Sequence, residues 1–450
     1  MEQVSPARET AFNILLEIER RRRLSDDLTR GKGILAISHA PEDRNLTYAL
    51  ITALVFGVLR WQIVLDAHIR PLLKRPNAKL DDEVLIALRL GAFQLAYMDR
   101  IPAHAVIDES VELVKKSGHR FASGMVNAVL RKLARDPAPA SIAPEIEAHP
   151  QWMVDRWTSL FGPKTASAIC RHDQSRPALA ARIHDPQTET ELALAGIVLA
   201  PGALLRAARR IVSGDNLGVT PAFREGRVRI QDEGSQLVAE IAGKGTEILD
   251  CCAAPGGKTI ILAERNPQAR IIACEVSPKR LEAMRRRLVA FGDRVACRLA
   301  DAATLEDSAQ HDLVLADVPC SGTGTLARNP EIRHRLQPED LARQSDRQRD
   351  ILAAALRAAC PGGRIVYSTC SLEPEENEHV IAAVLRDHPE ARVVSLAVRL
   401  EEMRAEGILT NEAATNLPTC LTPEGYLRLF PGTFGTDGFF VALIEKTGTC

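Results

Sequence analysis

The sequence lacks several features that mark common classes of protein. Its ten cysteines include no Cys-x-x-Cys pair, the spacing from which zinc sites and dithiol redox sites are usually built. It has no uncharged apolar stretch close to the roughly 20 residues that span a bilayer, and its start shows no basic-then-apolar signal pattern. We therefore expect a soluble, cytoplasmic protein with free thiols and with no metal, disulfide scaffold or membrane span.

Net charge and aromatic side chains are also scarce. The formal net charge is -1, so the chain as a whole offers no field that would attract nucleic acid. Aromatic residues make up only 4% of the chain, too few for an extended platform on which bases could stack. Residues 1–135 nevertheless hold 21 basic and 16 acidic side chains. That excess fits either a surface that faces a polyanion or an ordinary solvated helical surface.

The pattern along the chain indicates more than one domain, as 450 residues are too many for one ordinary core. Apolar residues recur at helical spacing in residues 1–138, which predicts an all-α bundle. Dense prolines in residues 139–150 predict a linker, and residues 151–235 predict a small connecting subdomain of mixed pattern. From 236 to 446, strands and helices alternate, which predicts an α/β domain with a parallel, Rossmann-like sheet.

Individual elements can be placed within these domains. Apolar runs that predict strands buried on both faces cover residues 246–251, 269–275, 294–299, 312–317 and 363–368. A closing strand pair is expected at 426–430 and 439–444, helices near 103–116, 121–134 and 151–170, and a further strand near 178–184. Residues 185–230 show no readable pattern.

A glycine-rich turn follows the first of the predicted strands. Its residues are Cys252, Ala253, Ala254, Pro255, Gly256, Gly257 and Lys258. The two glycines allow close backbone approach, and the helix that follows offers free amide donors to a ligand. A Walker A loop would need glycine where Cys252 stands, and the Gly-x-Gly-x-x-Gly fingerprint is absent as well. The turn therefore predicts a nucleotide-type site without a grip on phosphates.

Acidic residues follow the next two strands. Glu275 could accept hydrogen bonds from both hydroxyls of a ribose, and Asp301 could accept one from the exocyclic amine of adenine. Either acid alone would more often be a helix cap or a surface charge, but next to the turn they indicate a nucleoside ligand. Because no phosphate motif accompanies them, we expect an adenosine cofactor without a phosphate chain, and S-adenosylmethionine fits.

Two cysteines, Cys320 and Cys370, stand at strand ends on the same expected edge of the sheet. A thiolate can add to carbon 6 of cytosine, activate carbon 5 toward a methyl donor, and later leave. Asp317, three residues before Cys320, is placed to hydrogen-bond nitrogen 3 and the amino edge of the ring. This chemistry alone does not rank the two thiols. Small buried core residues are the alternative, which we expect for Cys170, Cys274, Cys297 and Cys360.

At these motifs the chain resembles the NOL1/NOP2/Sun family of RNA cytosine carbon-5 methyltransferases, and within it the bacterial Sun or RsmB type. The segments that match in order and spacing are 250–259, 317–324 and 367–377, with 231–237 and 437–440 flanking them. The front half is similar to the NusB-like RNA-binding module, most clearly at residues 106–113 and 124–131. The resemblance spans nearly the whole chain. Departures from the family pattern are Cys251, Glu275 and Val318.

The resemblance implies a role for each candidate residue. Cys370 would be the nucleophile, and Cys320 would aid release of the methylated RNA. The turn at 252–258 would bind S-adenosylmethionine together with Glu275, Asp301 and Asp317, and Asp317 would also lie near the base. A DNA cytosine methyltransferase, by contrast, would use the Pro-Cys cysteine, here Cys320, as its nucleophile.

The implied substrate is a cytosine of small-subunit (16S) ribosomal RNA before the subunit is assembled, methylated by a monomer. Such a cytosine must be unstacked before carbon 6 can be reached. Methylation of transfer RNA by the same chemistry is one alternative. Another is a non-catalytic RNA-binding or ribosome-assembly factor, which predicts loss of Cys370, Asp317 or the glycine turn, all of which are present. Arg328, Arg333, Arg335 and the run Arg20–Arg23 are candidate phosphate contacts.

Overall fold

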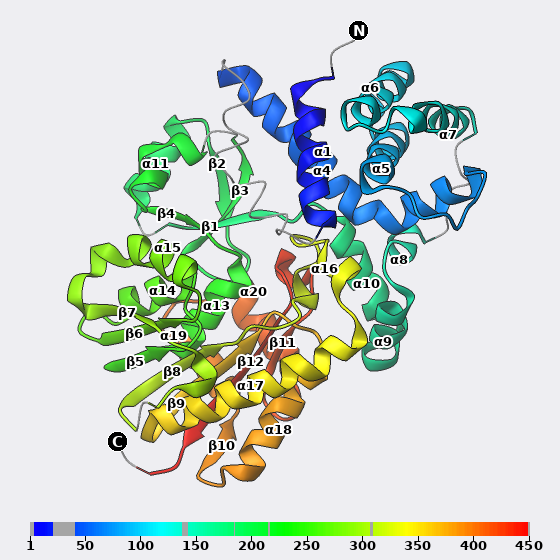
Figure 1. Cartoon of the computed structure of the whole chain (residues 1–450). Helices are drawn as coiled ribbons and strands as arrows, with labels where there is room; N and C mark the ends of the chain where they lie inside the picture. Colours follow the sequence, from blue (N-terminus) through cyan, green and yellow to red (C-terminus); the bar gives the residue numbers. More distant parts are fainter. Residues whose placement is uncertain are drawn as a thin grey trace. The chain divides into compact units, whose positions relative to one another are not determined.

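The computed structural model describes residues 4–20, 41–136, 143–183, 185–214, 217–306 and 309–448. The chain divides into two compact units, shown in Figure 1. The first contains Met1–Arg176 and Leu326–Arg335, and the second contains Pro177–Thr325 and Leu336–Cys450. The expected helical bundle and α/β domain are both confirmed. The sequence-based domain boundaries stay predictions; the compact units divide at residue 176, and the first also takes in Leu326–Arg335.

The first unit is helical throughout its described residues. Its helices are α1 (Pro6–Glu19), α4 (Pro41–Ile69), α5 (Asp82–Tyr97), α6 (Ala103–Lys116), α7 (Ser123–Arg135), α8 (Pro144–Glu147), α9 (Gln151–Phe161), α10 (Pro163–Gln174) and α16 (Ile332–Arg335). The helices expected near 103–116, 121–134 and 151–170 are thus confirmed. One core joins the helices α1, α4, α5, α6 and α7. Its buried residues include Leu15, Leu54, Leu88, Val114 and Leu130.

One stretch in the described residues, Thr47–Leu72, is long and apolar enough to cross a membrane by length and composition alone. It contains Arg60 and Asp66, and Asp66 pairs with the buried Arg89 of α5 at 2.7 Å. Leu54 and Leu65 on the same helix belong to the bundle core. The stretch therefore has the contacts of a core helix.

The segment 326–335 packs inside the helical unit although it lies far along the chain. The buried guanidinium of Arg333 donates to the backbone oxygens of Ala148 at 3.3 Å and Asp173 at 3.4 Å. Next to it, Arg335 donates to the backbone oxygen of Ile18 at 2.7 Å. Arg333 is only 1% exposed, so the suggestion that it contacts phosphates is wrong.

The second unit begins with a small antiparallel sheet. Most of this sheet lies in residues 185–230, for which the sequence pattern made no prediction. Its strands are β1 (Leu179–Ile183), β2 (Val198–Pro201), β3 (Ala208–Ser213) and β4 (Val228–Ile230), in the order β2-β3-β1-β4. The helices α11 (Pro186–Leu194) and α12 (Pro221–Arg224) accompany it. Ala181, Ile183, Leu192 and Val228 form its core. The strand expected near 178–184 is β1.

The large sheet has the order β10-β12-β9-β8-β5-β6-β7, and β11 pairs with β12. Its strands are β5 (Glu247–Asp250), β6 (Arg270–Glu275), β7 (Val295–Leu299), β8 (His311–Asp317), β9 (Ala359–Thr369), β10 (Ala391–Val394), β11 (Leu427–Leu429) and β12 (Phe439–Lys446). All neighbours from β9 to β7 run parallel, and β12 runs antiparallel to β9 and β10. The five predicted parallel strands and the closing pair are therefore confirmed, but the expected burial on both faces is wrong for β7, an edge strand in which only Val295 is buried.

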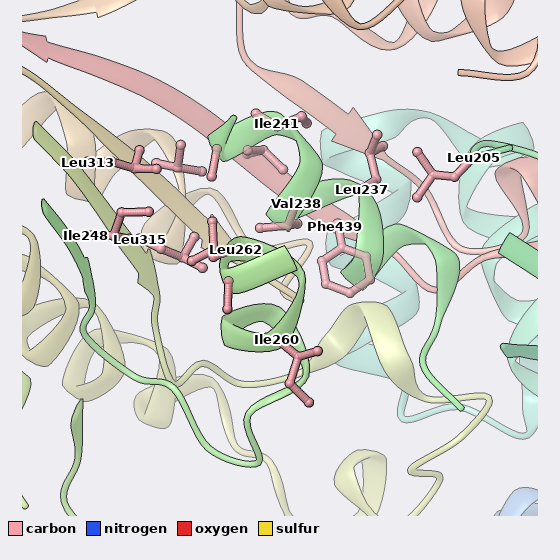
Figure 2. Packing of buried hydrophobic residues seen from close by; sticks show 14 of the residues in the cluster. Leu205, Leu237, Val238, Ile241, Ile248, Ile260, Leu262, Leu313, Leu315 and Phe439 are labelled. Carbon is pink, nitrogen blue, oxygen red and sulfur yellow. The ribbon is translucent and has the colours of Figure 1, made fainter. Parts of the chain in front are cut away.

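Helices cover both faces of this sheet because successive strand residues point to opposite sides. One face packs against α13 (Glu233–Ala242), α14 (Gly257–Arg265), α15 (Pro278–Leu288) and α19 (Leu396–Ala405). The other packs against α17 (Pro338–Ala358) and α18 (Glu378–Asp387), yellow and orange in Figure 1. Figure 2 shows side chains of α13 against those of β5 and β8: Leu237, Val238 and Ile241 against Ile248, Leu313 and Leu315.

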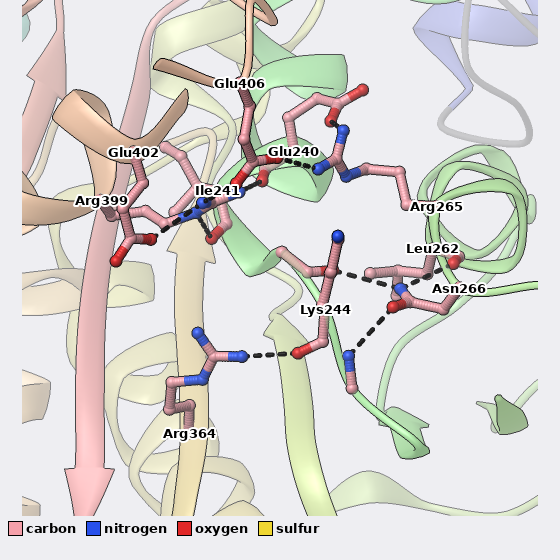
Figure 3. Close-up of polar contacts among 12 residues, drawn as sticks. Glu240, Ile241, Lys244, Leu262, Arg265, Asn266, Arg364, Arg399, Glu402 and Glu406 are labelled. Atoms are coloured by element: carbon pink, nitrogen blue, oxygen red, sulfur yellow. Dashed lines mark hydrogen bonds and ion pairs between the residues drawn. The ribbon is translucent and has the colours of Figure 1, made fainter. Parts of the chain in front are cut away.

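Polar contacts close the end of α13, as Figure 3 shows. Arg399 of α19 donates to the backbone oxygens of Glu240 at 2.9 Å and Ile241 at 3.0 Å. The last carbonyls of a helix have no partner within it, so this guanidinium satisfies two of them. The side chain of Asn266 accepts from the amide of Gly245 at 3.0 Å and fixes the turn into β5. These contacts hold the strand that leads to the glycine turn.

Candidate active site

The candidate residues lie at one edge of the large sheet. Strands β8, β5, β6 and β7 are consecutive neighbours and run parallel, so their carboxyl ends meet at the same edge. Asp250 ends β5, Glu275 ends β6 and Asp317 ends β8, while Asp301 follows β7 by two residues. Ligands of such sheets bind at this edge. The structure thus brings the sequence-predicted acids and the glycine turn to one edge.

The turn after β5 is held by a buried carboxylate beneath it. Thr259 Oγ1 donates to Asp250 Oδ2 at 2.7 Å, and burial raises the pKa of Asp250 to about 7. Gly256 has a φ of +98°, a conformation that side chains rarely adopt, and α14 begins at the next residue. The first-turn amides of α14 therefore follow directly on a turn with little side-chain bulk, which suits close approach of a ligand.

The two acids expected to hold adenosine also make local contacts. Glu275 is buried, accepts from the amide of Ser277 at 2.8 Å and pairs with Arg280 at 3.3 Å. Asp301 is exposed and accepts from the amide of Ala303 at 3.1 Å. Each ionised carboxylate has about four acceptor positions, so these contacts leave capacity for ribose hydroxyls and for an amine. These two hydrogen-bond acceptors therefore fit an adenosyl group.

Asp317 takes part in a charged pair at the end of β8. Its Oδ2 lies 2.7 Å from Lys258 Nζ, and its Oδ1 accepts from Ser368 Oγ at 2.7 Å. Burial by itself would lower the pKa of Lys258, but the charge and hydrogen bond of Asp317 act together with the nearby Cys370 and Asp250, and the pKa is raised. Lys258 Nζ also lies 5.8 Å from the ring centre of Phe439. The site therefore holds a fixed ammonium beside a carboxylate acceptor.

The two candidate cysteines are brought into contact. Cys320 follows β8 and Cys370 follows β9, and their sulfur atoms lie 3.3 Å apart. The hydrogen bond with Cys370 and burial both raise the pKa of Cys320 well above its ordinary value. Cys370 in turn acts electrostatically on Lys258 and helps to raise its pKa, so the thiol pair lies close to the Lys258–Asp317 pair. The motif residues that were far apart in the sequence thus form one cluster.

The other cysteines differ in burial and in pairing. Burial raises the pKa of Cys252 above its ordinary value, which makes that thiol a poor nucleophile. Cys170 and Cys274 are buried as expected, whereas Cys297 is half-buried. The expectation of free thiols is wrong at Cys360, which is disulfide-bonded, because residue spacing does not show which sulfur atoms a fold brings together. In the described part of the chain, no group of three or more His, Cys, Asp or Glu side chains could hold a metal.

The cysteine loops approach each other so closely that one position between them tolerates only glycine. The amide of Gly324 donates to the backbone oxygen of Cys370 at 2.9 Å, and its own oxygen accepts from the amide of Gly438 at 2.7 Å. A Cβ atom at Gly324 would lie 2.6 Å from the oxygen of Gly438 and 2.9 Å from that of Cys370. The backbone at Cys370 and the backbone at Gly438 would have to move to admit one methyl group.

We expect Gly324→Ala to lower the stability of the protein by about 1–3 kcal/mol and its methyl transfer by about tenfold or more, because the clash displaces the Cys370 loop. Thermal unfolding and initial rates measure both effects. Gly218→Ala is the matched control, since a Cβ there would meet nothing within 4 Å. Wild-type rates and melting temperature for Gly324→Ala would show that the loops do not need this close approach.

Sequence reasoning gave no role to one buried carboxylate in this cluster, Glu376. It stands in the third motif, and its contacts reach both cysteine loops. A signal was present, since each cysteine is followed by a serine, Ser321 or Ser371, that a shared acceptor could bind. The separation of these residues along the chain concealed the arrangement.

Comparison with known proteins finds relatives over nearly the whole chain. Residues 241–445 match the family model described as 16S rRNA methyltransferase RsmB/F, and residues 5–135 match the NusB family. The chain is 30% identical to "Probable ribosomal RNA small subunit methyltransferase B" of Bacillus subtilis, over 98% of this chain and 99% of that protein. It is 34% identical to ribosomal RNA small subunit methyltransferase B of Pseudomonas putida, over 90% of this chain and 91% of that protein.

A solved structure supports the fold. The crystal structure of PH0851 is similar over 99% of this chain and 100% of that one, with a TM-score of 0.81 and 24% sequence identity. The two relatives and both family models lead to one conclusion, which the cluster of residues at the carboxyl edge of the large sheet supports. The chain belongs to the RsmB family of methyltransferases, which take their methyl group from S-adenosylmethionine and carry a NusB-type helical domain.

Proposed function

We propose that the protein methylates carbon 5 of a cytosine in small-subunit ribosomal RNA through a covalent bond between Cys370 and the base. The observation that carries the proposal is the pair of sulfur atoms 3.3 Å apart, beside the Lys258–Asp317 pair at the carboxyl edge of the sheet. The two relatives, which match 98% and 90% of the chain, are named for this RNA substrate.

The chemistry follows from the low reactivity of carbon 5. The sulfur of Cys370 bonds to carbon 6, which gives carbon 5 enamine character and lets it form a bond to a methyl group. Water then takes the proton from carbon 5, and the electron pair of that bond expels the Cys370 sulfur from carbon 6 as a thiolate. S-adenosylmethionine, when bound, supplies the electrophilic methyl group. Asp317 would accept from the exocyclic amine of the base, and the Lys258 ammonium would donate toward nitrogen 3.

The assignment of Cys370 as nucleophile has support of its own. Cys320 retains its proton, because its hydrogen bond with Cys370 and its burial disfavour the thiolate. Either sulfur could be the donor in the 3.3 Å contact, and the raised pKa of Cys320 favours its thiol as the donor and Cys370 as the acceptor. Cys370 is then the sulfur that attacks, and Cys320 is the thiol that can later protonate the Cys370 sulfur as it leaves carbon 6.

The remaining candidate residues would bind the cofactor. The turn Cys252–Lys258 and the helix that follows it would receive the amino acid part, with Glu275 at the ribose and Asp301 at the adenine. The cytosine would have to leave its stack to reach the sulfur, which favours single-stranded or unassembled RNA as substrate. Because bacteria make and process ribosomal RNA in the cytoplasm and these relatives are bacterial, the protein would act there.

The experiment is methylation by the purified full-length protein with S-adenosylmethionine that carries a labelled methyl group. Protein-free small-subunit RNA, assembled small subunits and transfer RNA serve as separate substrates. We expect label in the protein-free ribosomal RNA alone, recovered as 5-methylcytidine after digestion. Label only in transfer RNA, or on another atom or base, would contradict the proposal, and so would the absence of label from every substrate.

A further inference from the structure

The carboxylate of Glu376 is a buried acceptor that joins the two cysteine loops. Its Oε1 accepts from the amide of Ser321 at 2.8 Å and from Gln348 Nε2 at 3.0 Å. Its Oε2 accepts from the hydroxyls of Ser321 and Ser371. Ser321 directly follows Cys320, and Ser371 directly follows Cys370. One side chain therefore binds the residue after each sulfur.

The contacts around this carboxylate fix its own position. Tyr367 donates to the backbone oxygen of Glu376 at 2.5 Å. Gln348 reaches a second acceptor on the Cys320 loop, the oxygen of Pro319 at 2.9 Å. The hydroxyls of Ser321 and Ser371 lie 3.1 Å apart. The carboxylate is thus held by β9 and α17 while it holds the two loops.

The energetics point to a role beyond filling space. Glu376 is fully buried, and among the described residues no Lys or Arg pairs with it, so four hydrogen bonds alone compensate its charge. An apolar side chain of the same size would leave these buried donors without an acceptor, at a cost to the fold of about 1–3 kcal/mol for each donor that finds no other partner. A carboxylate stands here because three of the four donors belong to the two cysteine loops and the fourth belongs to α17.

We infer that Glu376 is a positioning residue that ties the Cys320 and Cys370 loops together and sets the separation of their sulfur atoms. The consequence for catalysis rests on the proposed function. If the tie is lost, Cys320 no longer lies against Cys370, and the step that frees the methylated base slows more than the step that attacks it.

A direct test reads the separation of the sulfur atoms without RNA or cofactor. Diamide oxidises two adjacent thiols to a disulfide: the sulfur–sulfur bond forms as the reagent takes up both hydrogens and is reduced to its hydrazine. We expect Glu376→Ala to form the Cys320–Cys370 disulfide about tenfold more slowly than the wild type, measured by peptide mass spectrometry. Glu376→Gln should react at the wild-type rate, because its amide can accept from the two N–H donors and donate to the two hydroxyls.

Glu233→Ala is the control for a merely structural effect. Glu233 is also buried, and it accepts from the amides of Ala203, Leu204 and Leu205, which lie outside both cysteine loops. We expect this variant to melt at a lower temperature and to crosslink at the wild-type rate. If Glu376→Ala does not fold, Ser371→Ala, which removes one hydroxyl donor, should still slow crosslinking by about threefold. Wild-type crosslinking rates in both Glu376→Ala and Ser371→Ala would overturn the inference.

A second readout separates this inference from the proposed function. During turnover, Glu376→Ala should accumulate RNA covalently bound to the enzyme, seen on a denaturing gel, while its KM for S-adenosylmethionine stays within about twofold of the wild-type value. Slowed crosslinking with no adduct in any variant would support the tie and reject the covalent mechanism. Wild-type crosslinking in Glu376→Ala, together with an adduct in Cys320→Ala, would reject the tie and support the covalent mechanism.

Discussion

Cys370→Ala is expected to lose methyl transfer by about 10⁴-fold or more while the protein remains folded. In the proposed mechanism no other group forms the bond to carbon 6, because Cys320 is held as a thiol and the burial of Cys252 raises the pKa of its thiol. Cys370 is half-buried at the end of β9, so removal of its sulfur should cost only about 1 kcal/mol of stability. Incorporation of labelled methyl groups into protein-free small-subunit RNA measures the activity.

Cys297→Ala provides the matched control for this result. Cys297 is a half-buried thiol in β7 that packs against the same core as Cys370. Its removal should leave the rate within about twofold of the wild type. Full activity in Cys370→Ala would reject the nucleophile, whereas inactive Cys320→Ala together with a trapped adduct in Cys370→Ala would exchange the two roles.

The central sheet could be predicted because parallel strands buried on both faces give continuous apolar runs. Runs such as 269–275 and 312–317 stand out from their charged surroundings and correspond to β6 and β8. The order of the motifs also placed the turn, Glu275 and Asp317 at strand ends. Since parallel strands end at one edge, residues more than 60 positions apart could be expected to form one site.

Only β1 of the small sheet could be predicted, because the other three strands carry weak signals. The strand β3 has the sequence ARRIVS, and β4 has only three residues, so neither gives a long alternation. In the expected linker, Pro144 stands at the first position of α8, where proline suits the start of a helix. Short elements of this kind depend on tertiary contacts more than on local pattern.

Contacts over long sequence separations were also hidden. The carbonyls that receive Arg333 belong to Ala148 and Asp173, at least 160 positions away, so the arginine looked like a surface charge. The donors to Glu376 come from three separate segments, those of Ser321, Gln348 and Ser371. No local pattern indicates that these segments meet, although the motif around Cys370 drew attention to the right region.

Cys320→Ala is expected to retain attack on the base and to lose release of the product. The sulfur of Cys370 remains able to bond to carbon 6, but the thiol that lies 3.3 Å from it and keeps its proton is removed. The enzyme should then accumulate as a covalent RNA adduct during the first turnover, while multiple turnover falls by about 10²-fold or more. A denaturing gel with labelled small-subunit RNA shows the adduct as a band of reduced mobility.

The double variant Cys320→Ala, Cys370→Ala distinguishes this adduct from any other crosslink, because it lacks the sulfur that bonds to the base and should give no shifted band. A Cys320→Ser variant adds a further constraint. Its hydroxyl preserves the size and hydrogen-bonding capacity of the side chain but is a far weaker acid than a thiol. An adduct in both Cys320→Ala and Cys320→Ser would assign product release to the acidity of the Cys320 thiol. An adduct in Cys320→Ala alone would assign product release to hydrogen bonding at that position. Rapid turnover in both variants would show that the second thiol has no part in product release.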